Sequence, residues 1–455
     1  MATTVTGSTS TISPGASTSL ATPNVGVCRV RTCTSNTSGD ELVQAIVTIT
    51  SSWQYAVVSP TTVAEHRQRV AELVGLMPVL QLTLDECLGL VLAADVIAPV
   101  SLPPFDNSAM DGYAVRAADL AGTIPVRLPV ADDIPAGRTQ LNPLEPGTVQ
   151  RIMTGAPVPP GADAVIQVEL TDGGTETVTI NASVAEGTNI RTAGDDVQKG
   201  DPVLVAGTVL RPAQLGLASA LGLAELPVRR RPRVLILSTG SELVEPGRPL
   251  QPGQIYESNG MMLASSVREA GGIAVQLRFV PDDVDAFHRA LAPYLGSVDV
   301  IVTSGGVSAG AYEVVKDALV SHDVRFTKVA MQPGGPQGAG TYEGVPVLTL
   351  PGNPVSAQVS FEVFVRPALL RSMGHAQVER PSARATVTTT LTSPAGKTQF
   401  RRGLYDPSSG QVVTPVGGPG SHLLSALALS NCLIEVPQDV TELAAGAEVT
   451  VRYLQ

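Results

Sequence analysis

The sequence predicts a multidomain α/β plus β protein, in which a doubly wound α/β domain is combined with β-rich segments. Continuous apolar stretches at 233–237, 298–303 and 345–350 predict buried strands, and helical patterns at 259–270 and 285–295 lie between them. Buried strands that alternate with amphipathic helices are typical of a parallel sheet covered on both faces. The chain has 455 residues, which is enough for roughly three domains.

Short β-prone pieces flank this α/β pattern on both sides. The segment 100–208 is expected to form a β module, because four such pieces are separated there by glycine and proline: 126–130, 163–169, 177–180 and 203–205. After about Pro381 the chain is again β-prone and no helix is predicted, which indicates a small β domain at the C-terminal end.

The chain before the β module begins with a low-complexity stretch. Residues 1–58 open with many Ser, Thr, Gly and Ala residues, which cannot bury enough apolar surface to offset their ordering entropy, so we expect a disordered or atypical extension. From Val63 onward, apolar residues recur at helical spacing and predict a helix that ends before Pro78. Further helices are predicted at 84–93 and 212–224.

Composition excludes several classes of function. The net charge of −11 and the aromatic content of 4% argue against nucleic-acid binding, which needs positive charge and often aromatic stacking. The four cysteines form no C-x-x-C pair, so neither a disulfide framework nor a structural zinc site is expected. No apolar run reaches about 18 residues, and no charged residue precedes Arg29. We therefore expect no membrane span, no secretory signal and a cytoplasmic location.

Acidic and polar side chains are concentrated in the proline-braced loop PFDNSAMDGYAVR at 104–116. Asp106 and Asp111 lie close together there, beside an amide, a hydroxyl and a glycine. One interpretation is a turn, since these residue types favour turns. The other is a cluster of hard oxygen ligands for Mg²⁺ or a site for an oxyanion-bearing substrate. An EF-hand is excluded, because Met110 and Asp111 occupy the positions that require an oxygen ligand and a glycine.

Three glycine-bearing loops each follow a buried strand and open a helix, at 238–243, 304–319 and 351–361. In an open α/β sheet such loops meet at the carboxyl ends of the strands, where helix N-termini favour phosphate groups. The acids Glu242, Asp282 and Glu313 lie on or near these loops. Together with Asp111 they could form a metal site if the β module folds over this edge.

Two other functions are compatible with parts of this pattern. Residues 306–310 satisfy G-x-S-x-G, the elbow of α/β-hydrolases, with Ser308 as the nucleophile and His375 or His422 as the base. Few strands precede this serine and no oxyanion segment is visible, which counts against a hydrolase. A non-catalytic scaffold is the other alternative, although a scaffold does not require several carboxylates near an anion site.

Five motifs together resemble one family. They are PFDNSAMDGYAVR, RIMTGAPVPPGADAV at 151–165, NIRTAGDDVQKGD at 189–201, SGGVS at 304–308 and LPGNPVSA at 350–357. From about Val63 to the C-terminal end, the chain is similar to the molybdopterin molybdenumtransferases, which include MoeA and the E domain of gephyrin. The five motifs occur in the order expected for that family.

This resemblance implies an enzyme of molybdenum cofactor synthesis. Adenylylated molybdopterin and molybdate would be the substrates, AMP would be released, and Mg²⁺ would be required. The protein would be a homodimer whose site lies between the α/β domain of one subunit and the β module of the other.

The resemblance also implies a division of the chain into four domains. A linker domain would comprise 59–99 with 198–232, and the β-rich domain 100–197. A MogA-like α/β domain would span 233–378, and a small C-terminal β-barrel 379–455.

Functional residues follow from the resemblance, motif by motif. The catalytic candidates are Asp111, Thr154, Asp196, Glu242, Asp282 and Glu313, and four of these are implied metal ligands: Asp111, Glu242, Asp282 and Glu313. The substrate-binding candidates are Ser304, Gly305, Gly306, Ser308, Lys328, Pro351, Gly352, Asn353, Pro354, Arg402 and Ser421.

The chain departs from the family pattern at three positions. Many members read K-P-G-K-P where this chain has Gln332 and Gly335, so two cations are missing from an anion site and Lys328 and nearby arginines remain. Glu313 occupies the register of the usual aspartate and is one methylene longer. A paralogue that uses a related oxyanion such as tungstate is therefore the main alternative within the family.

Overall fold

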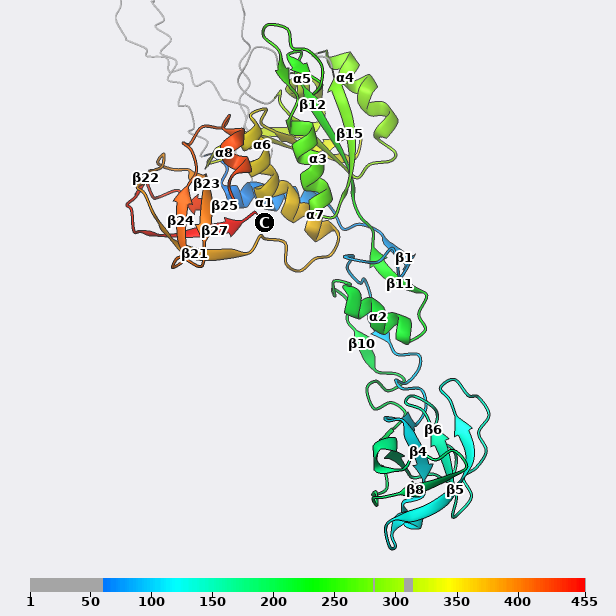
Figure 1. Ribbon diagram of the computed structural model, residues 1–455. Coiled ribbons are helices and arrows are strands. Elements are labelled where there is room, and N and C mark those ends of the chain that lie inside the picture. The colour runs from blue at the N-terminus through cyan, green and yellow to red at the C-terminus, as the bar shows by residue number, and fades with distance from the viewer. Residues whose placement is uncertain (1–59, 281–282, 307–313, 455) are drawn as a thin grey trace, which may run out of the picture. The chain divides into compact units, whose positions relative to one another are not determined.

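A six-stranded sheet forms the α/β part of the computed structural model, which describes residues 60–280, 283–306 and 314–454 (Figure 1). Its strands are β12 (Arg233–Thr239), β15 (Ile273–Val280), β16 (Val300–Ser304), β17 (Asp323–Lys328), β19 (Pro336–Tyr342) and β20 (Val345–Leu350). The order is β15-β12-β16-β20-β19-β17. The first four strands are parallel, which confirms the predicted sheet. The antiparallel strands β19 and β17, which extend it, were not predicted.

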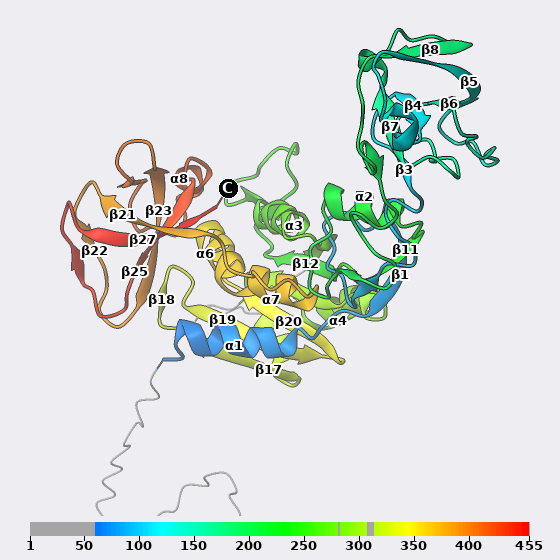
Figure 2. The same ribbon diagram turned by 90° about the horizontal axis from the view of Figure 1, so that it is seen from below.

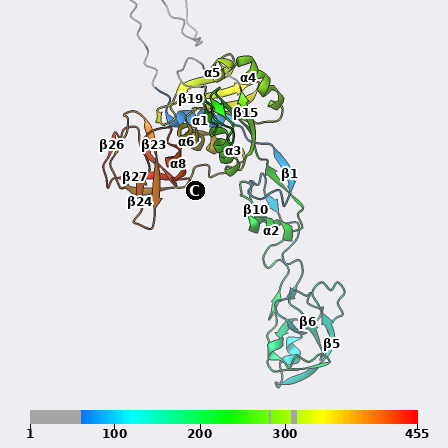
Figure 3. The same cartoon turned by 45° about the horizontal axis from the view of Figure 1, so that its top comes forward.

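Helices cover both faces of this sheet. They are α1 (Val63–Leu73), α3 (Asn259–Glu269), α4 (Val284–Leu291), α5 (Val314–Leu319), α6 (Pro354–Ser360) and α7 (Arg366–Ser372), and one π-helical turn joins α6 to α7. Val234 and Ile236 of β12 pack in the core that contains α1, α3, α6 and α7. Leu235 and Leu237 pack on the other face with α4 and α5. Figure 2 shows α1 beside β17 and β19, and Figure 3 shows α4 and α5 side by side.

The start of α1 follows from a capping box. The backbone N–H of Glu65 donates to Thr62 Oγ1 at 3.1 Å, and the backbone N–H of Thr62 donates to the Glu65 carboxylate at 2.7 Å. The predicted helix at 84–93 was wrong. Its backbone pairs instead with a distant segment, because Leu92 N–H donates to Thr208 O and Leu90 O accepts from Leu210 N–H, each at 2.9 Å.

Two segments that precede the α/β sheet in the sequence, and that are far apart from each other along the chain, pair through short strands. Strand β1 (Val79–Thr83) is antiparallel to β11 (Glu225–Arg229), and β2 (Val96–Ile97) is antiparallel to β10 (Pro202–Leu204). Helix α2 (Pro212–Ala220) lies between β10 and β11 in the sequence and confirms the helix predicted there.

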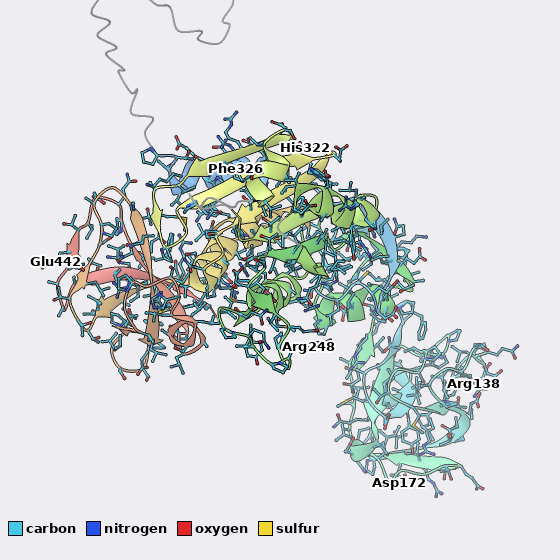
Figure 4. The ribbon with its side chains drawn as sticks, turned by 90° about the horizontal axis from the view of Figure 1, so that it is seen from above. Arg138, Asp172, Arg248, His322, Phe326 and Glu442 are labelled. Carbon is cyan, nitrogen blue, oxygen red and sulfur yellow. The ribbon has the colours of Figure 1, made fainter. Side chains whose placement is uncertain are left out.

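A β-rich module occupies the sequence between β2 and β10. Its five-stranded sheet has the order β7-β4-β6-β5-β8, and its bounds are β4 (Gly112–Val115), β5 (Val126–Ile134), β6 (Val149–Ile152), β7 (Ala164–Gln167) and β8 (Thr177–Ile180). A second, two-stranded pairing joins β3 (Asn107–Ser108) to β9 (Ile190–Arg191). Arg138 and Asp172, labelled in Figure 4, belong to this module.

Five strands of the C-terminal region form a closed barrel. They are β21 (Ser382–Val387), β23 (Thr398–Asp406), β24 (Val412–Pro415), β25 (Cys432–Val436) and β27 (Glu448–Tyr453), and the pairing of β23 with β25 closes the ring. Shorter elements also occur: β13 (Leu243–Val244), β14 (Ile255–Tyr256), β18 (Met331–Gln332), β22 (Leu391–Thr392), β26 (Glu442–Leu443) and α8 (Leu424–Ala428). The helix α8 contradicts the expectation of a C-terminal region without helices. Within the described ranges, every helix is too short or too polar to span a bilayer.

His66 on α1 predicts a loss of stability in mild acid. Its ring packs edge-on against Phe364, with the ring centroids 4.7 Å apart, and burial lowers its pKa from 6.5 to about 4. As the pH falls, the unfolded chain therefore takes up a proton on His66 before the folded protein does. The contribution of neutral His66 to the free energy of unfolding is complete above about pH 6.5 and is lost as the pH falls toward 4. We expect this residue to reduce the free energy of unfolding by about 2 kcal/mol between pH 7 and pH 5.

Urea unfolding at the two pH values measures this effect. His66→Leu should remove about 2 kcal/mol of the pH dependence, because leucine does not titrate. If the free energy of unfolding of this variant differs between pH 7 and pH 5 by as much as that of wild type, the acid sensitivity belongs to other groups.

Candidate functional site

The loops that follow β12, β16 and β20 meet at one edge of the sheet and line a cleft of about 1010 Å³. The three strands are parallel neighbours, so their carboxyl ends lie together. The lining residues are Ser238, Thr239, Gly240, Ser241, Glu242, Leu243, Ile255, Tyr256, Glu257, Ser258, Asn259, Ser304, Gly305, Gly306, Val314, Pro336, Pro351, Gly352, Asn353, Pro354, Ser356 and His422. The cleft thus collects eight predicted site residues: Glu242, Ser304, Gly305, Gly306, Pro351, Gly352, Asn353 and Pro354.

Backbone conformation explains the glycines after β16. Gly305 and Gly306 have φ angles of +100° and +67°, which side chains of L-residues rarely adopt. A Cβ on Gly305 would lie 3.0 Å from the carbonyl oxygen of Thr239, and a Cβ on Gly306 would lie 2.8 Å from Val315 Cγ2. Both positions therefore need glycine. Because Gly305 has no Cβ, the loop can pass close to Thr239 at the end of β12.

A second carboxylate in the cleft was missed from the sequence. Glu257 accepts hydrogen bonds from Ser238 Oγ at 2.9 Å and from the Gly260 backbone N–H at 2.6 Å. It thereby links the end of β12 to the start of α3, and it lines the same cleft as Glu242. The available signal was an acid just before a helix start, which sequence reasoning treats as a favourable helix-dipole interaction.

The predicted metal ligands are only partly within the described residues. Asp282, Glu313 and the substrate-binding candidate Ser308 lie outside the described ranges, as does most of the G-x-S-x-G elbow. Among the residues that are described, no group of three or more His, Cys, Asp or Glu side chains could hold a metal ion. The four-carboxylate metal site stays a prediction.

Asp111 and Thr154 form a hydrogen-bonded pair in the β module. Asp111 Oδ1 accepts from the Thr154 backbone N–H at 2.6 Å and from Thr154 Oγ1 at 2.7 Å. These bonds, the backbone one first, hold the pKa of the exposed Asp111 carboxyl below its usual range. The carboxylate is therefore ionised at neutral pH. In contrast, Asp106 Oδ1 accepts from Ala193 N–H at 2.7 Å and connects two loops of the module.

Several predicted residues do not line the cleft. Asp111, Thr154, Asp196, Lys328, Arg402 and Ser421 are absent from its lining. Asp196 is exposed and binds Leu102 O through its backbone N–H at 3.0 Å, and Lys328 is exposed at the end of β17. Figure 4 labels Phe326 on the same edge strand.

A second cavity of about 310 Å³ adjoins the cleft. It is lined by Gln332, Pro333, Gly334, Ser356, Pro419, Gly420 and Ser421, and Ser356 lines both cavities. The carbonyl of Ser421 accepts from the Val355 N–H of α6 at 3.1 Å, so a barrel loop contacts the start of this helix. The adjacent His422 lines the cleft. The barrel therefore contributes to both cavities.

Two buried arginines lie behind the barrel loop. Arg401 and Arg402 are 7% and 1% exposed, and they donate to the carbonyl oxygens of Gly417 and Gly418. Among the described residues, Arg401 Nε and Arg402 Nε and Nη1 have no hydrogen-bond partner. Burial lowers the pKa of both guanidinium groups, and for Arg402 the charge of Arg401 adds to the effect. This region therefore carries concentrated positive charge.

Three protein-family models match successive parts of the chain. They are the MoeA N-terminal region (domain I and II) at residues 61–222, the "Probable molybdopterin binding domain" at 235–371 and the MoeA C-terminal region (domain IV) at 384–454. The last two matches contain the sheet with its cleft and the closed barrel.

Whole-length relatives agree with these matches. Molybdopterin molybdenumtransferase 2 of Mycobacterium tuberculosis (strain H37Rv) is 55% identical over 400 residues, which cover 86% of this chain and 98% of the relative. Molybdopterin molybdenumtransferase of Haemophilus influenzae is 40% identical over 377 residues, 81% of this chain and 92% of the relative. A crystal structure of the molybdopterin biosynthesis MoeA protein from Pyrococcus horikoshii has a TM-score of 0.70 at 29% identity, and covers 87% of this chain and 100% of its own. The chain belongs to the MoeA family, whose curated relatives are named molybdopterin molybdenumtransferase.

Proposed function

We propose that the protein is a molybdopterin molybdenumtransferase, which transfers molybdenum from molybdate to adenylylated molybdopterin and releases AMP. The observation that carries the proposal is the glycine-lined cleft at the carboxyl edge of the parallel sheet, within the region that matches the molybdopterin-binding model. The name of the relative that is 55% identical supports the same activity.

The cleft is suited to a phosphate-bearing substrate. Gly305 and Gly306 let the backbone approach a ligand closely, and the N-terminus of α3 borders the same space. Backbone N–H groups and the positive end of a helix dipole favour negative charge. We propose that these loops hold the pyrophosphate of the adenylylated substrate, with Pro351, Gly352, Asn353 and Pro354 forming the opposite wall.

Carboxylate oxygens form the donor set that we propose for Mg²⁺. Glu242 is exposed within the cleft, and one oxygen of Asp111 accepts both bonds from Thr154, which leaves the other for a ligand. These hard oxygens fit Mg²⁺, and Asp282 and Glu313 would complete the set. A bound Mg²⁺ supplies charge neutralisation on the pyrophosphate as the adenylyl bond breaks.

The second cavity is our candidate for the oxyanion. Ser421 lines it, and the positive charge of Arg401 and Arg402 lies behind the loop that forms its wall. Gln332 also lines it, with its Oε1 held by Gln399 Nε2 at 2.7 Å. An amide is neutral, so the missing lysine charge weakens attraction for any dianion. Molybdate or the related tungstate could bind here.

We propose a homodimer in which Asp111 completes the site of the partner subunit. The support is that the Asp111–Thr154 pair is exposed but does not line the cleft of its own chain. Three further features stay proposals: the domains 59–99 with 198–232, 100–197, 233–378 and 379–455, the role of Lys328, and the cytoplasmic location. The expectation of a disordered or atypical segment at 1–58 falls outside the described residues.

A single assay tests the proposed activity. The purified protein is mixed with adenylylated molybdopterin, Mg²⁺ and molybdate, and AMP is quantified by chromatography. We expect AMP release to depend on molybdate. Release of AMP that requires tungstate instead would favour the divergent paralogue. No release with either oxyanion would contradict the proposal and would favour a non-catalytic scaffold. Labelling of Ser308 by a fluorophosphonate would favour a serine hydrolase.

A further inference from the structure

The side chain of Asn259 joins two loops of the cleft. Its Nδ2 donates to Ser304 Oγ and to the carbonyl oxygen of Gly352, each at 2.7 Å. Ser304 ends β16 and Gly352 follows β20. Asn259 itself begins α3, so one amide group connects three elements that border the same cleft.

Helix capping does not account for this asparagine. The N-cap of α3 is Ser258, and Asn259 occupies the first helical position, where asparagine has no special advantage. Both hydrogens of its amide are given to other loops. Aspartate has the same shape but no hydrogen to donate, and serine has only one. The two contacts therefore need a side chain with two N–H donors, and asparagine supplies them.

Among the described residues, one acceptor and one donor at this contact are left unused. The buried Oδ1 of Asn259 accepts no hydrogen bond there, which costs stability and calls for a functional reason. Ser304 Oγ accepts from Asn259, and no described group accepts the Ser304 hydroxyl hydrogen. Ser304 lines the cleft, so as far as the described groups go, that hydrogen is free to bond a ligand.

The two loops are also in close contact through their glycines. A Cβ on Gly352 would lie 3.4 Å from the Cα of Gly305, and the Gly305 N–H donates to Leu350 O at 3.1 Å. The two loops are therefore closely spaced. The hydrogen bonds from Asn259 Nδ2 to both loops fix their relative orientation.

We propose that Asn259 is a positioning residue, which sets the spacing of the loops at 304–306 and 350–354 and orients the Ser304 hydroxyl for a phosphate-bearing ligand. The identity of the ligand rests on the proposed function, whereas the locking of the loops does not. Asn259 acts through Ser304 and Gly352 and takes no part in bond breaking.

Two variants separate shape from hydrogen bonding. Asn259→Asp keeps the side-chain shape, and its charge is favourable in the first turn of α3, so folding is retained. Asn259→Ala adds no charge that could repel an anion. Asn431→Ala is the matched control, because Asn431 also makes two bonds, to the backbone N and O of Tyr405, in the barrel and away from the cleft. Circular dichroism checks the folding of all three.

Hydrogen–deuterium exchange of the ligand-free protein tests the locking of the loops. Peptides that cover 304–306 and 350–354 should exchange faster in both Asn259 variants and at the wild-type rate in the Asn431 control. Unchanged exchange in the Asn259 variants would overturn the inference, whatever the enzyme activity proves to be.

Binding of AMP then tests the consequence for the site. Loss of the two bonds should weaken AMP binding about tenfold in each Asn259 variant, measured by calorimetry, and raise KM more than it lowers kcat. AMP binding within twofold of wild type would overturn the positioning role. If the exchange rates change but the wild type neither binds AMP nor releases it, the locking of the loops stands and the proposed function fails.

Discussion

Asp111→Asn is expected to lower kcat/KM about a hundredfold, because it removes a negative charge from the proposed Mg²⁺ site. Folding should be retained. Asparagine Oδ1 can still accept both hydrogen bonds from Thr154, and Asp111 is exposed. The midpoint of urea unfolding should therefore stay close to that of wild type. Steady-state AMP release and urea unfolding measure the two effects.

Asp172→Asn is the matched control for this variant. Asp172 is also an exposed acid of the β module whose pKa is lowered by hydrogen bonds, chiefly from Thr179, and Figure 4 labels it. Its replacement should leave AMP release unchanged. Equal activity of Asp111→Asn and wild type would remove Asp111 from the site. Because the pKa of Asp111 is also lowered, any loss of activity between pH 7 and pH 5 must come from another group.

Gly305→Ala is expected to reduce kcat/KM by between about tenfold and about a hundredfold. It should also lower the free energy of unfolding by about 1–3 kcal/mol. The alanine Cβ would lie 3.0 Å from Thr239 O at a φ of +100°, so the loop must move. A displaced loop changes the wall of the cleft, and small misplacements of binding groups have large effects on rate. Thermal unfolding and AMP-release kinetics measure the two changes.

The control for Gly305→Ala is Gly296→Ala in the same α/β region. A Cβ on Gly296 meets no atom within 4 Å, and its φ lies outside the strained range. Stability and activity should both remain at wild-type values there. If Gly305→Ala behaves like this control, the loop does not need its left-handed conformation for function.

Local patterns predicted much of the α/β fold. The stretches at 233–237, 298–303 and 345–350 form buried parallel strands, as expected from their apolar character. Helix α3 also lies where periodicity placed it. The antiparallel strands β17 and β19 were missed, because β19 contains two glycines and carries little strand signal. The helix at 84–93 failed because backbone pairing with residues 208–210 outweighed a local helical pattern.

The candidate site shows the same division. The glycine loops after three strands were recognised, since parallel strands bring their carboxyl ends together. Glu257 and Asn259 were missed, because polar residues before and at a helix start have an ordinary local explanation. Only their contacts with Ser238, Ser304 and Gly352 show that they connect loops of the cleft.

The sequence by itself determined the fold class, the family motifs and the loops that line the cleft, because each depends on residues close together in the chain. The tertiary structure decided which distant groups meet. It paired Asp111 with Thr154, closed the barrel through β23 and β25, and brought His422 of the barrel to the cleft. These contacts arise from packing between segments that are remote in sequence, and no local periodicity encodes them.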